Sequence, residues 1–305
     1  MRIIDSLKTK AAVPVAFICA MLLALFAPSP RACAEQDWSG FYIGAHVGGT
    51  SNNYDIKSYD EHVDVIAQFY QELGMGVSGE VESGFSDFTL PRDNGSSNTR
   101  PTGGFQAGYN MQFGHIVVGL ESNVGFTGAD ETARGSGFAE KFFTVQFTND
   151  TEADTTLTTK RHAEMNWNAS TELHLGYTWN QFLFYVLGGG AFAGVTVTTQ
   201  DVASTDFFQF NNEGGGIAPQ QGRFLGNVTN GLNNENSQVL TGYTAGGGVA
   251  MALTSLVSVN LEYRHTGYGE GNFHFQGSEF IVPGSNNVAV DSDQVLFKVN
   301  LLLGH

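Results

Sequence analysis

The stretch MNWNASTELHLGYTW, Met165 to Trp179, decides the fold class. Apolar and polar side chains alternate along it with a period of two, which is typical of a β-strand that has one apolar face. The apolar face contains Met165, Trp167, Ala169, Leu173, Leu175, Tyr177 and Trp179, and the polar face contains Asn166, Asn168, Ser170, Glu172, His174 and Thr178. Such a face has to meet either the protein's own core or lipid.

The same strand-like pattern recurs along the chain, so eight strands are predicted in all. The further segments are 41–49, 105–111, 116–126, 182–197, 239–251, 257–264 and 295–301. In six of them one face is apolar and the other carries amides, charges or glycines. Segment 182–197 is partly apolar on both faces, so its orientation is left open.

The connections between these strands alternate strictly in length. Three are tight turns, at 112–115, 179–181 and 254–255, and four are long and polar, at about 50–102, 127–161, 198–237 and 267–287. Short periplasmic turns alternating with long extracellular loops are typical of an outer-membrane barrel. Only a helix or a closed barrel can pair every backbone group in hydrocarbon, so the apolar faces are predicted to meet lipid. The alternative, a water-soluble aromatic core, fits poorly with acids and amides on the opposite face.

The N-terminal residues 1–34 are predicted to be a secretory signal peptide, which leaves residues 35–305 as the barrel domain. Arg2, Lys8 and Lys10 precede the apolar run Val15–Ala27, and the small residues ACA at 32–34 follow. A retained membrane anchor is the alternative. A lipoprotein is disfavoured, because Pro30 and Arg31 stand where an apolar lipobox should be.

Both cysteines, Cys19 and Cys33, lie in the predicted signal peptide. The exported part would therefore have no disulfide and no cysteine metal site.

The charge balance makes nucleic acid an improbable partner. The chain has 14 basic and 30 acidic residues. The signal segment accounts for four of the basic and one of the acidic residues, which leaves 10 against 29 and a net charge of −19. No later run of about 18 apolar residues predicts a transmembrane helix.

Several quoted segments together resemble one family of outer-membrane proteins. They are WSGFYIGAHVGG, GGFQAGYNMQFGHIVVGLESNVGF, LHLGYTWNQFLFYVLGGGAFAGV, TGYTAGGGVAMALTSLVSVNLEYRHTGYG and QVLFKVNLL. This set closely resembles the small opacity-like outer-membrane β-barrel family of alphaproteobacteria, whose members are often described as porins or surface antigens. The resemblance implies an eight-stranded barrel that contacts outer-membrane lipid, lipopolysaccharide and the outer-membrane assembly machinery. It also implies haemin binding in some members.

The sequence departs from this family in its last residues. Such barrels usually end in an aromatic residue that the assembly machinery recognises, whereas this sequence ends LLLGH with His305. We expect either less efficient insertion or a signal read from Phe297 or Leu303.

Five charged residues on the polar faces are predicted to meet inside the barrel. Glu121, Glu172, Glu262 and Lys298 each lie roughly seven residues from a short turn or from the C-terminus, and Arg264 lies slightly higher. An eight-stranded barrel is only wide enough for its own side chains to fill. The set predicts either a narrow gated ion path or a structural plug, and the plug is favoured. No cofactor or metal is expected there.

Histidines in the loops and at the barrel rim suggest two further hypotheses. His62 and His274, with nearby aromatic residues, could bind haem, which uses His or Tyr ligands in apolar pockets; packing between loops is the alternative. His265 resembles the histidine of lipid A deacylases, which have a serine two residues later. Here that position is Gly267.

The overall prediction is a non-enzymatic outer-membrane protein with a structural role and an exposed surface. Its loops are expected to contact a host or surface ligand. The alternatives are a narrow porin for small solutes, a haemin-binding receptor and, remotely, a lipid A-modifying enzyme.

Overall fold

The computed structural model describes residues 36–56, 60–73, 85–89, 98–145, 149–211, 222–282 and 286–303. The chain divides into two compact units, Met1–Gln36 and Asp37–His305, and the fold below is that of the second. The predicted signal peptide, 1–34, and the C-terminal His305 lie outside the described residues. Among those residues, no helix has the length and apolar character needed to cross a membrane.

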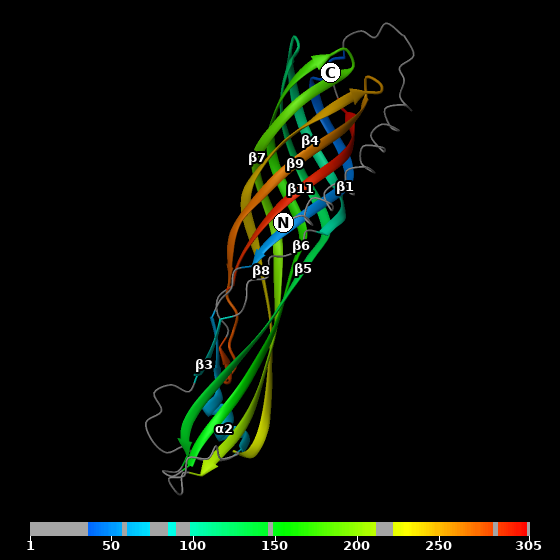
Figure 1. Ribbon diagram of the computed structural model, residues 1–305. Helices are drawn as coiled ribbons and strands as arrows, with labels where there is room; N and C mark the ends of the chain where they lie inside the picture. The colour runs from blue at the N-terminus through cyan, green and yellow to red at the C-terminus, as the bar shows by residue number, and fades with distance from the viewer. Residues whose placement is uncertain are drawn as a thin grey trace, which may run out of the picture. The chain divides into compact units, whose positions relative to one another are not determined.

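Eight antiparallel strands form a closed barrel, which confirms the predicted architecture (Figure 1). In the order of the ring they are β1 (Gly40–Ile56), β11 (Asn286–Leu302), β9 (Val257–Phe273), β8 (Arg223–Ala252), β7 (Phe182–Asn211), β6 (Asn149–Trp179), β5 (Ile116–Val145) and β4 (Asn98–Phe113). The ring closes because β1 pairs with both β11 and β4. No barrel strand therefore keeps an open edge within the ring.

Tight turns join the strands at one end of the barrel. Gly114 and Asn180 have φ angles of 61° and 56° in the turns between β4 and β5 and between β6 and β7. Glycine and asparagine are the residues that adopt this left-handed conformation most readily, so they suit two-residue hairpin turns. In the third turn, the Leu253 amide donates to the Val257 carbonyl at 2.9 Å.

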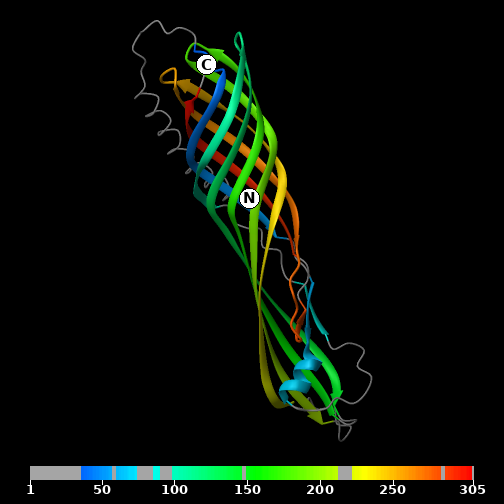
Figure 2. The ribbon, with the colours of Figure 1, turned by 180° about the vertical axis from the view of Figure 1, so that it is seen from behind.

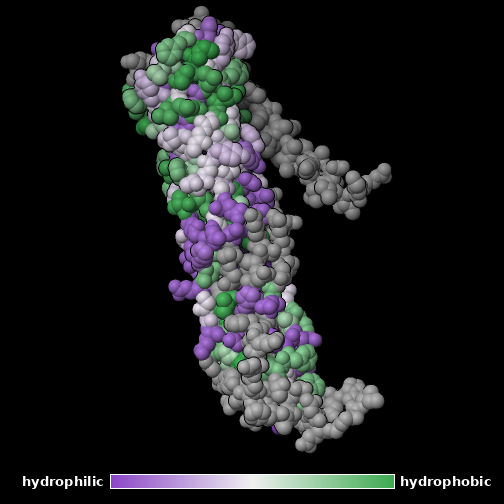
Figure 3. All heavy atoms as spheres, turned by 90° about the vertical axis from the view of Figure 1, so that its left-hand side faces the viewer, coloured by the Kyte–Doolittle hydropathy of each residue, from purple (hydrophilic) through white to green (hydrophobic). Residues whose placement is uncertain are grey.

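The barrel is apolar outside and polar inside, as predicted. Leu173 and Trp179 are 65% and 62% exposed, whereas Glu172, directly before Leu173 on the same strand, is fully buried. Figure 3 shows apolar residues gathered on the outer surface of the barrel and hydrophilic residues gathered beyond it. In water such an outer surface would be unfavourable, because burial of apolar area drives folding. Surrounded by hydrocarbon, it is the expected arrangement.

The four predicted long loops are largely wrong, because much of their sequence is strand. β5 to β8 each contain 30 or 31 residues, although about 9–11 residues span a membrane. Only 146–148 and 212–222 separate these strands within the segments predicted as loops at 127–161 and 198–237. Likewise β1 continues to Ile56 and β9 to Phe273. These extensions are rich in threonine, a β-branched residue that favours strands even where both faces are polar.

A β-bulge reverses the faces of β6 where it leaves the barrel. The register of β6 with β7 shifts between Met165 and Trp167, so Asn166 is an extra residue. Met165 was predicted to share the outward face of Trp167, but it is fully buried inside. That assignment is wrong, because an inserted residue exchanges the two faces of a strand. Beyond the bulge, Leu157 and Ala163 point inward with Met165.

A second, smaller sheet and a helix pack near the far ends of the long strands (Figure 2). The sheet has the order β10 (Ile281–Val282), β2 (Asp60–Asp64) and β3 (Phe85–Thr89), and α2 (Val65–Leu73) follows β2 directly. The Asp64 carboxylate caps the helix by accepting hydrogen bonds from the amides of Ile66 and Ala67, at 3.1 and 2.9 Å.

The helix contributes to an apolar core on the inner face of the extended strands. The Phe69 ring of α2 lies 5.2 Å from the rings of both Phe143 and Phe207. The buried members of this cluster are Val63, Val65, Phe69, Phe88, Phe143, Ala153, Leu157, Ala203, Phe207, Val228 and Ile281. The extended parts of β5–β8 therefore form a sheet with its own core, called here the extracellular sheet.

Side-chain amides cover one edge of the extracellular sheet. The described backbone pairing of β8 with β9 ends at Gly242 and Tyr268. Further along β8, three side-chain amides donate to backbone carbonyls instead: Asn234 to Gln276 at 2.9 Å, Asn236 to His274 at 2.7 Å and Gln238 to Asn272 at 2.5 Å. This row is called here the amide seam.

Candidate functional site

The five charged residues predicted for the lumen lie in one connected network. Lys298 Nζ is 2.8 Å from Glu121 Oε1 and 2.6 Å from Glu262 Oε2. The Arg264 guanidinium bridges Glu262 and Glu172, at 2.6 and 2.9 Å. All five side chains are buried. Negative and positive groups therefore alternate across the barrel from Glu121 to Glu172.

Neutral donors complete this charge network. The hydroxyls of Tyr42 and Tyr185 donate to Glu121 and Glu262, each at 2.8 Å. Ser170 and the Asn123 amide both donate to Glu172, at 2.5 and 3.1 Å. Hydrogen bonds to charged groups are the stronger class, and they offset part of the cost of removing carboxylates from water.

The two tyrosines were not predicted to be site residues. Tyr42 is only 5% exposed and points into the lumen. The sequence did contain a signal for this orientation, because Tyr42 and His46 are both even-numbered residues of β1 and therefore lie on the same face of that strand. Tyr185 lies in the strand whose orientation the sequence left open. The structure places it inside, with Leu183 and Leu187.

Apolar layers lie on both sides of the charge network. Toward the short turns, a cluster joins Trp38, Val117, Leu183, Tyr185, Leu187 and Ala250. Toward the extracellular sheet, a second cluster contains Tyr54, Ile56, Ala163, Met165, Ala191, Ala193, Val195, Val197, Leu240, Tyr268, Phe273, Val288 and Val290. The inside of the barrel is thus charged only in its middle layer. Segment 182–197 contributes to both apolar layers, which explains its apolar inner face.

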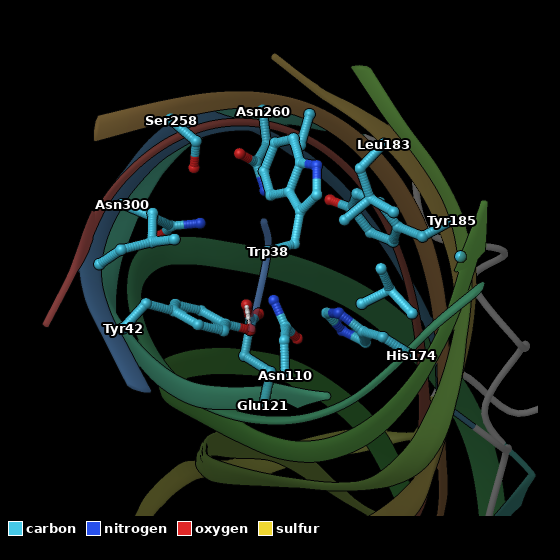
Figure 4. Close-up of a pocket in the computed structure, with 14 residues that line it drawn as sticks. Trp38, Tyr42, Asn110, Glu121, His174, Leu183, Tyr185, Ser258, Asn260 and Asn300 are labelled. Carbon is cyan, nitrogen blue, oxygen red and sulfur yellow. Dashed lines mark hydrogen bonds between the residues drawn. The ribbon is translucent and has the colours of Figure 1, made fainter. Parts of the chain in front are cut away.

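A small cavity lies between the charge network and the layer at the short turns. It measures about 30 Å³, enough for one or two water molecules. Figure 4 shows the Trp38 indole inside the ring of strands, with Tyr42, Asn110, Glu121 and His174 pointing toward the same space. Asn260 and Asn300 complete a lining that is rich in oxygen acceptors. We call this space the lumen pocket.

The two predicted haem ligands belong to different parts of the fold. His62 lies in β2, and its Nδ1 is 2.6 Å from the Asp87 carboxylate of β3. His274 follows the end of β9, where its backbone carbonyl accepts from the Asn236 amide of the amide seam. The two histidines therefore lie in different elements and contact different partners.

His265 lies on the outer surface of the barrel. Its Nδ1 is 2.9 Å from the Asp293 carboxylate, which also accepts a 2.7 Å hydrogen bond from Tyr263. Gly267, two residues further along, pairs with Tyr243. A His–Asp pair is present, but the serine of the deacylase pattern is replaced by glycine.

The family described as outer membrane protein beta-barrel domain matches residues 17–295. The chain belongs to this family. A 22 kDa outer membrane protein of Rhizobium leguminosarum bv. viciae is 26% identical over 245 residues, which are 80% of this chain and 70% of that protein. This outer-membrane β-barrel protein is accordingly located in the cell outer membrane, in contact with lipid and lipopolysaccharide.

Solved outer-membrane proteins show more distant likeness. OprG of Pseudomonas aeruginosa is 13% identical with a TM-score of 0.37, over 89% of this chain and 99% of that one. The attachment invasion locus protein of Yersinia pestis is 10% identical with a TM-score of 0.26, over 85% and 99%. Members of the matched family are mostly non-enzymatic.

Proposed function

We propose that this outer-membrane β-barrel protein is a structural anchor that displays the extracellular sheet at the cell surface, and that its lumen does not conduct passively. The charge network carries this proposal. Its five buried charges are bonded to one another across the lumen, and an ion would have to break these contacts to pass. The apolar layers on both sides add a second barrier, because an ion there would lose its hydration.

The length of the long strands supports the display role. At about 3.3 Å per residue, 30 residues extend roughly 100 Å, against a hydrocarbon thickness of about 30 Å. The outer face of the extracellular sheet carries polar rows such as Thr156, Ser204 and Thr229 and an acidic row that includes Glu140 and Asp154. It also exposes the rings of Phe138 and Phe142. Such a face suits contacts with a host or surface ligand, or cation bridges to anionic lipopolysaccharide.

A labelling experiment tests the display. Both cysteines lie within residues 1–34, so a cysteine introduced elsewhere is a specific probe once that segment is removed. Thr158→Cys, exposed on the extracellular sheet, should react with an impermeant maleimide on intact cells. Asn180→Cys, exposed in a short turn, should react only after permeabilisation. The reverse result would refute the orientation and with it the display role.

Single-channel conductance distinguishes the porin alternative from the proposed anchor function. The lumen pocket gives it partial support, because it provides a polar space on the side of the short turns. We expect no steady single-channel current from the wild type in planar bilayers, and current only when Lys298 or Glu262 is replaced. A reproducible wild-type conductance would favour the porin.

The proposed insertion by the assembly machinery involves β11. Phe297 and Leu303 both point away from the lumen at the end of the chain. They are available there for recognition before the barrel closes against β1. The haemin hypothesis lacks comparable support, because His62 and His274 have separate surroundings.

A further inference from the structure

The lumen pocket contains buried polar atoms that the fold itself leaves without partners. Trp38 Nε1, His174 Nε2 and Asn260 Oδ1 have no hydrogen-bond partner among the described residues, although all three line this pocket. Buried polar groups in proteins are nearly always hydrogen-bonded, and each exception calls for an explanation such as a bound water or ion. Three exceptions in one small space point to an occupant.

His174 is held so that its ring edge points into the pocket. It is 9% exposed, and its ring stacks on that of Tyr185 at 5.1 Å with an angle of 14° between the planes. Its Nε2 is 3.5 Å from Glu172 Oε2. This contact falls outside good hydrogen-bond geometry, so the nitrogen keeps a lone pair or a proton directed at the carboxylates.

The strand register brings two carboxylates beside this imidazole. Glu121 of β5 pairs directly with Glu172 of β6, and His174 is two residues further along β6 on the same face. Glu121, Glu172 and His174 can each offer one ligand atom, and these atoms all lie within 4.8 Å of one another. Like charges directly opposite on paired strands are destabilising, and here Lys298 and Arg264 each offset one of the two carboxylates.

The charge balance leaves room for a further cation. The charge network contains three carboxylates but only two permanently positive groups, Arg264 and Lys298. One negative charge therefore remains, and a divalent ion that carries one hydroxide would neutralise it. The contacts of Glu172 Oε2 are long, at 3.2 Å to the Arg264 guanidinium and 3.5 Å to His174 Nε2.

We propose that one divalent transition-metal ion of the Zn²⁺ class binds at the edge of the lumen pocket that His174 and Glu121 line, with His174, Glu121 and Glu172 as ligands. Imidazole nitrogen together with carboxylate oxygen is a donor set that suits such ions. A volume of about 30 Å³ accepts the ion with one or two waters. Those waters can bond to Asn260 Oδ1 and to Trp38 Nε1, the remaining atoms without partners.

Trp38 provides the measurement, because it lines the same pocket. Replacing the outward-facing Trp167 and Trp179 with phenylalanine leaves Trp38 as the single tryptophan of residues 35–305, so that it can be excited selectively over tyrosine. In the folded protein in detergent, Co²⁺ should quench Trp38 saturably with one ion per chain. Zn²⁺ should compete with it, and a chelator should restore the emission.

Two histidine variants test the assignment. His174→Gln should weaken binding by more than about 100-fold, since even outer-shell partners of a metal typically account for about 10–100-fold. The matched control is His265→Gln, whose histidine contacts Asp293 on the outer surface; it should bind Co²⁺ like the parent. Saturable quenching that persists in His174→Gln, or its absence in the parent at millimolar Co²⁺, overturns the proposal.

A second measurement does not depend on any variant at His174. X-ray absorption at the zinc edge of the loaded wild type should show one imidazole nitrogen among oxygen ligands. A first shell of oxygen alone overturns the assignment of His174, even if His174→Gln fails to fold. Steady conductance in the same preparation would count only against the proposed anchor function, so the two proposals fail separately.

Discussion

The barrel and the extracellular sheet share the strands β5 to β8 but are built inside out relative to each other. Within the barrel, apolar side chains such as Leu173 face outward and the ionised Glu172 faces inward. In the extracellular sheet, apolar side chains such as Leu157 face inward and Thr158 faces outward. The solvent outside each region accounts for the difference, because lipid surrounds one and water the other.

Each region also contains a buried ionic cluster. In the extracellular sheet, Arg161 pairs with both Glu61 of β2 and Asp201 of β7, and Thr159 donates to the same Asp201 at 2.6 Å. This cluster attaches the small sheet to the long strands. The charge network performs the corresponding task across the lumen. Comparing the two regions teaches that continuous strands can serve two solvents if the composition of each face changes along the strand, as in β7, or if a bulge shifts the alternation, as in β6.

Within the barrel, Arg264→Met should cost about 3–5 kcal/mol of unfolding free energy, because it leaves Glu172 and Glu262 buried without this partner. The loss should appear as a lower temperature for the shift in unheated electrophoretic migration and as a lower urea midpoint. Arg134→Met, at an exposed position of the extracellular sheet, is the matched control and should change neither value. Unchanged stability in Arg264→Met would mean that the charge network contributes little.

In the extracellular sheet, Arg161→Met should have a smaller effect of about 3 kcal/mol. Glu61 belongs to the short strand β2, which can move away and return its carboxylate to water. The change should increase proteolysis of the sheet while the migration of the unheated barrel stays the same, with Arg134→Met again as control. A change in barrel migration would contradict the separation of the two regions.

The smallest effect concerns the acidic row on the outer face of the sheet. Partial burial, together with repulsion from Glu140 and Asp206, raises the pKa of Asp154 above its ordinary value of 3.8. A carboxyl group with a raised folded-state pKa lowers stability as pH rises through that pKa. Asp154→Asn should therefore stabilise the sheet at pH 7, by well under about 1 kcal/mol because the group lies at the surface of the sheet and is partly exposed to solvent.

This gain should disappear at acid pH, where the wild-type carboxyl is protonated. Protease protection measured at pH 7 and below pH 3.8 would show it. Thr158→Asn, on the same face between Ser136 and Val202, introduces the same side chain without removing a charge. A gain that is independent of pH, or one shared by Thr158→Asn, would exclude electrostatic repulsion as its cause.

The sequence predicts the barrel well because its two faces differ so strongly. A pattern such as Leu173, Leu175 and Tyr177 against Glu172 and His174 has only one arrangement that leaves ions out of lipid. The grouping of the five charges could also be predicted, since distance from a turn sets height in a barrel of regular strands. These predictions used only local periodicity and strand geometry.

The extracellular sheet was harder to predict for a physical reason. In water a strand can carry polar residues on both faces, so polarity alone did not separate strand from loop in segments such as 198–237. The bulge at Asn166 then reversed the pattern without any glycine or proline to mark it. The lumen pocket was missed for a related reason, because Trp38 lies before β1 and only the closed barrel brings it to His174.

The amide seam affects how neighbouring copies of the protein can associate at the cell surface. A long sheet edge with free backbone groups is a template for other strands, and displayed sheets would then stick to one another. The side-chain amides of Asn234, Asn236 and Gln238 bond this edge to backbone carbonyls of residues 272–276 of the same chain. We infer that this segment shields the edge, so that a strand of a neighbouring copy cannot pair with it.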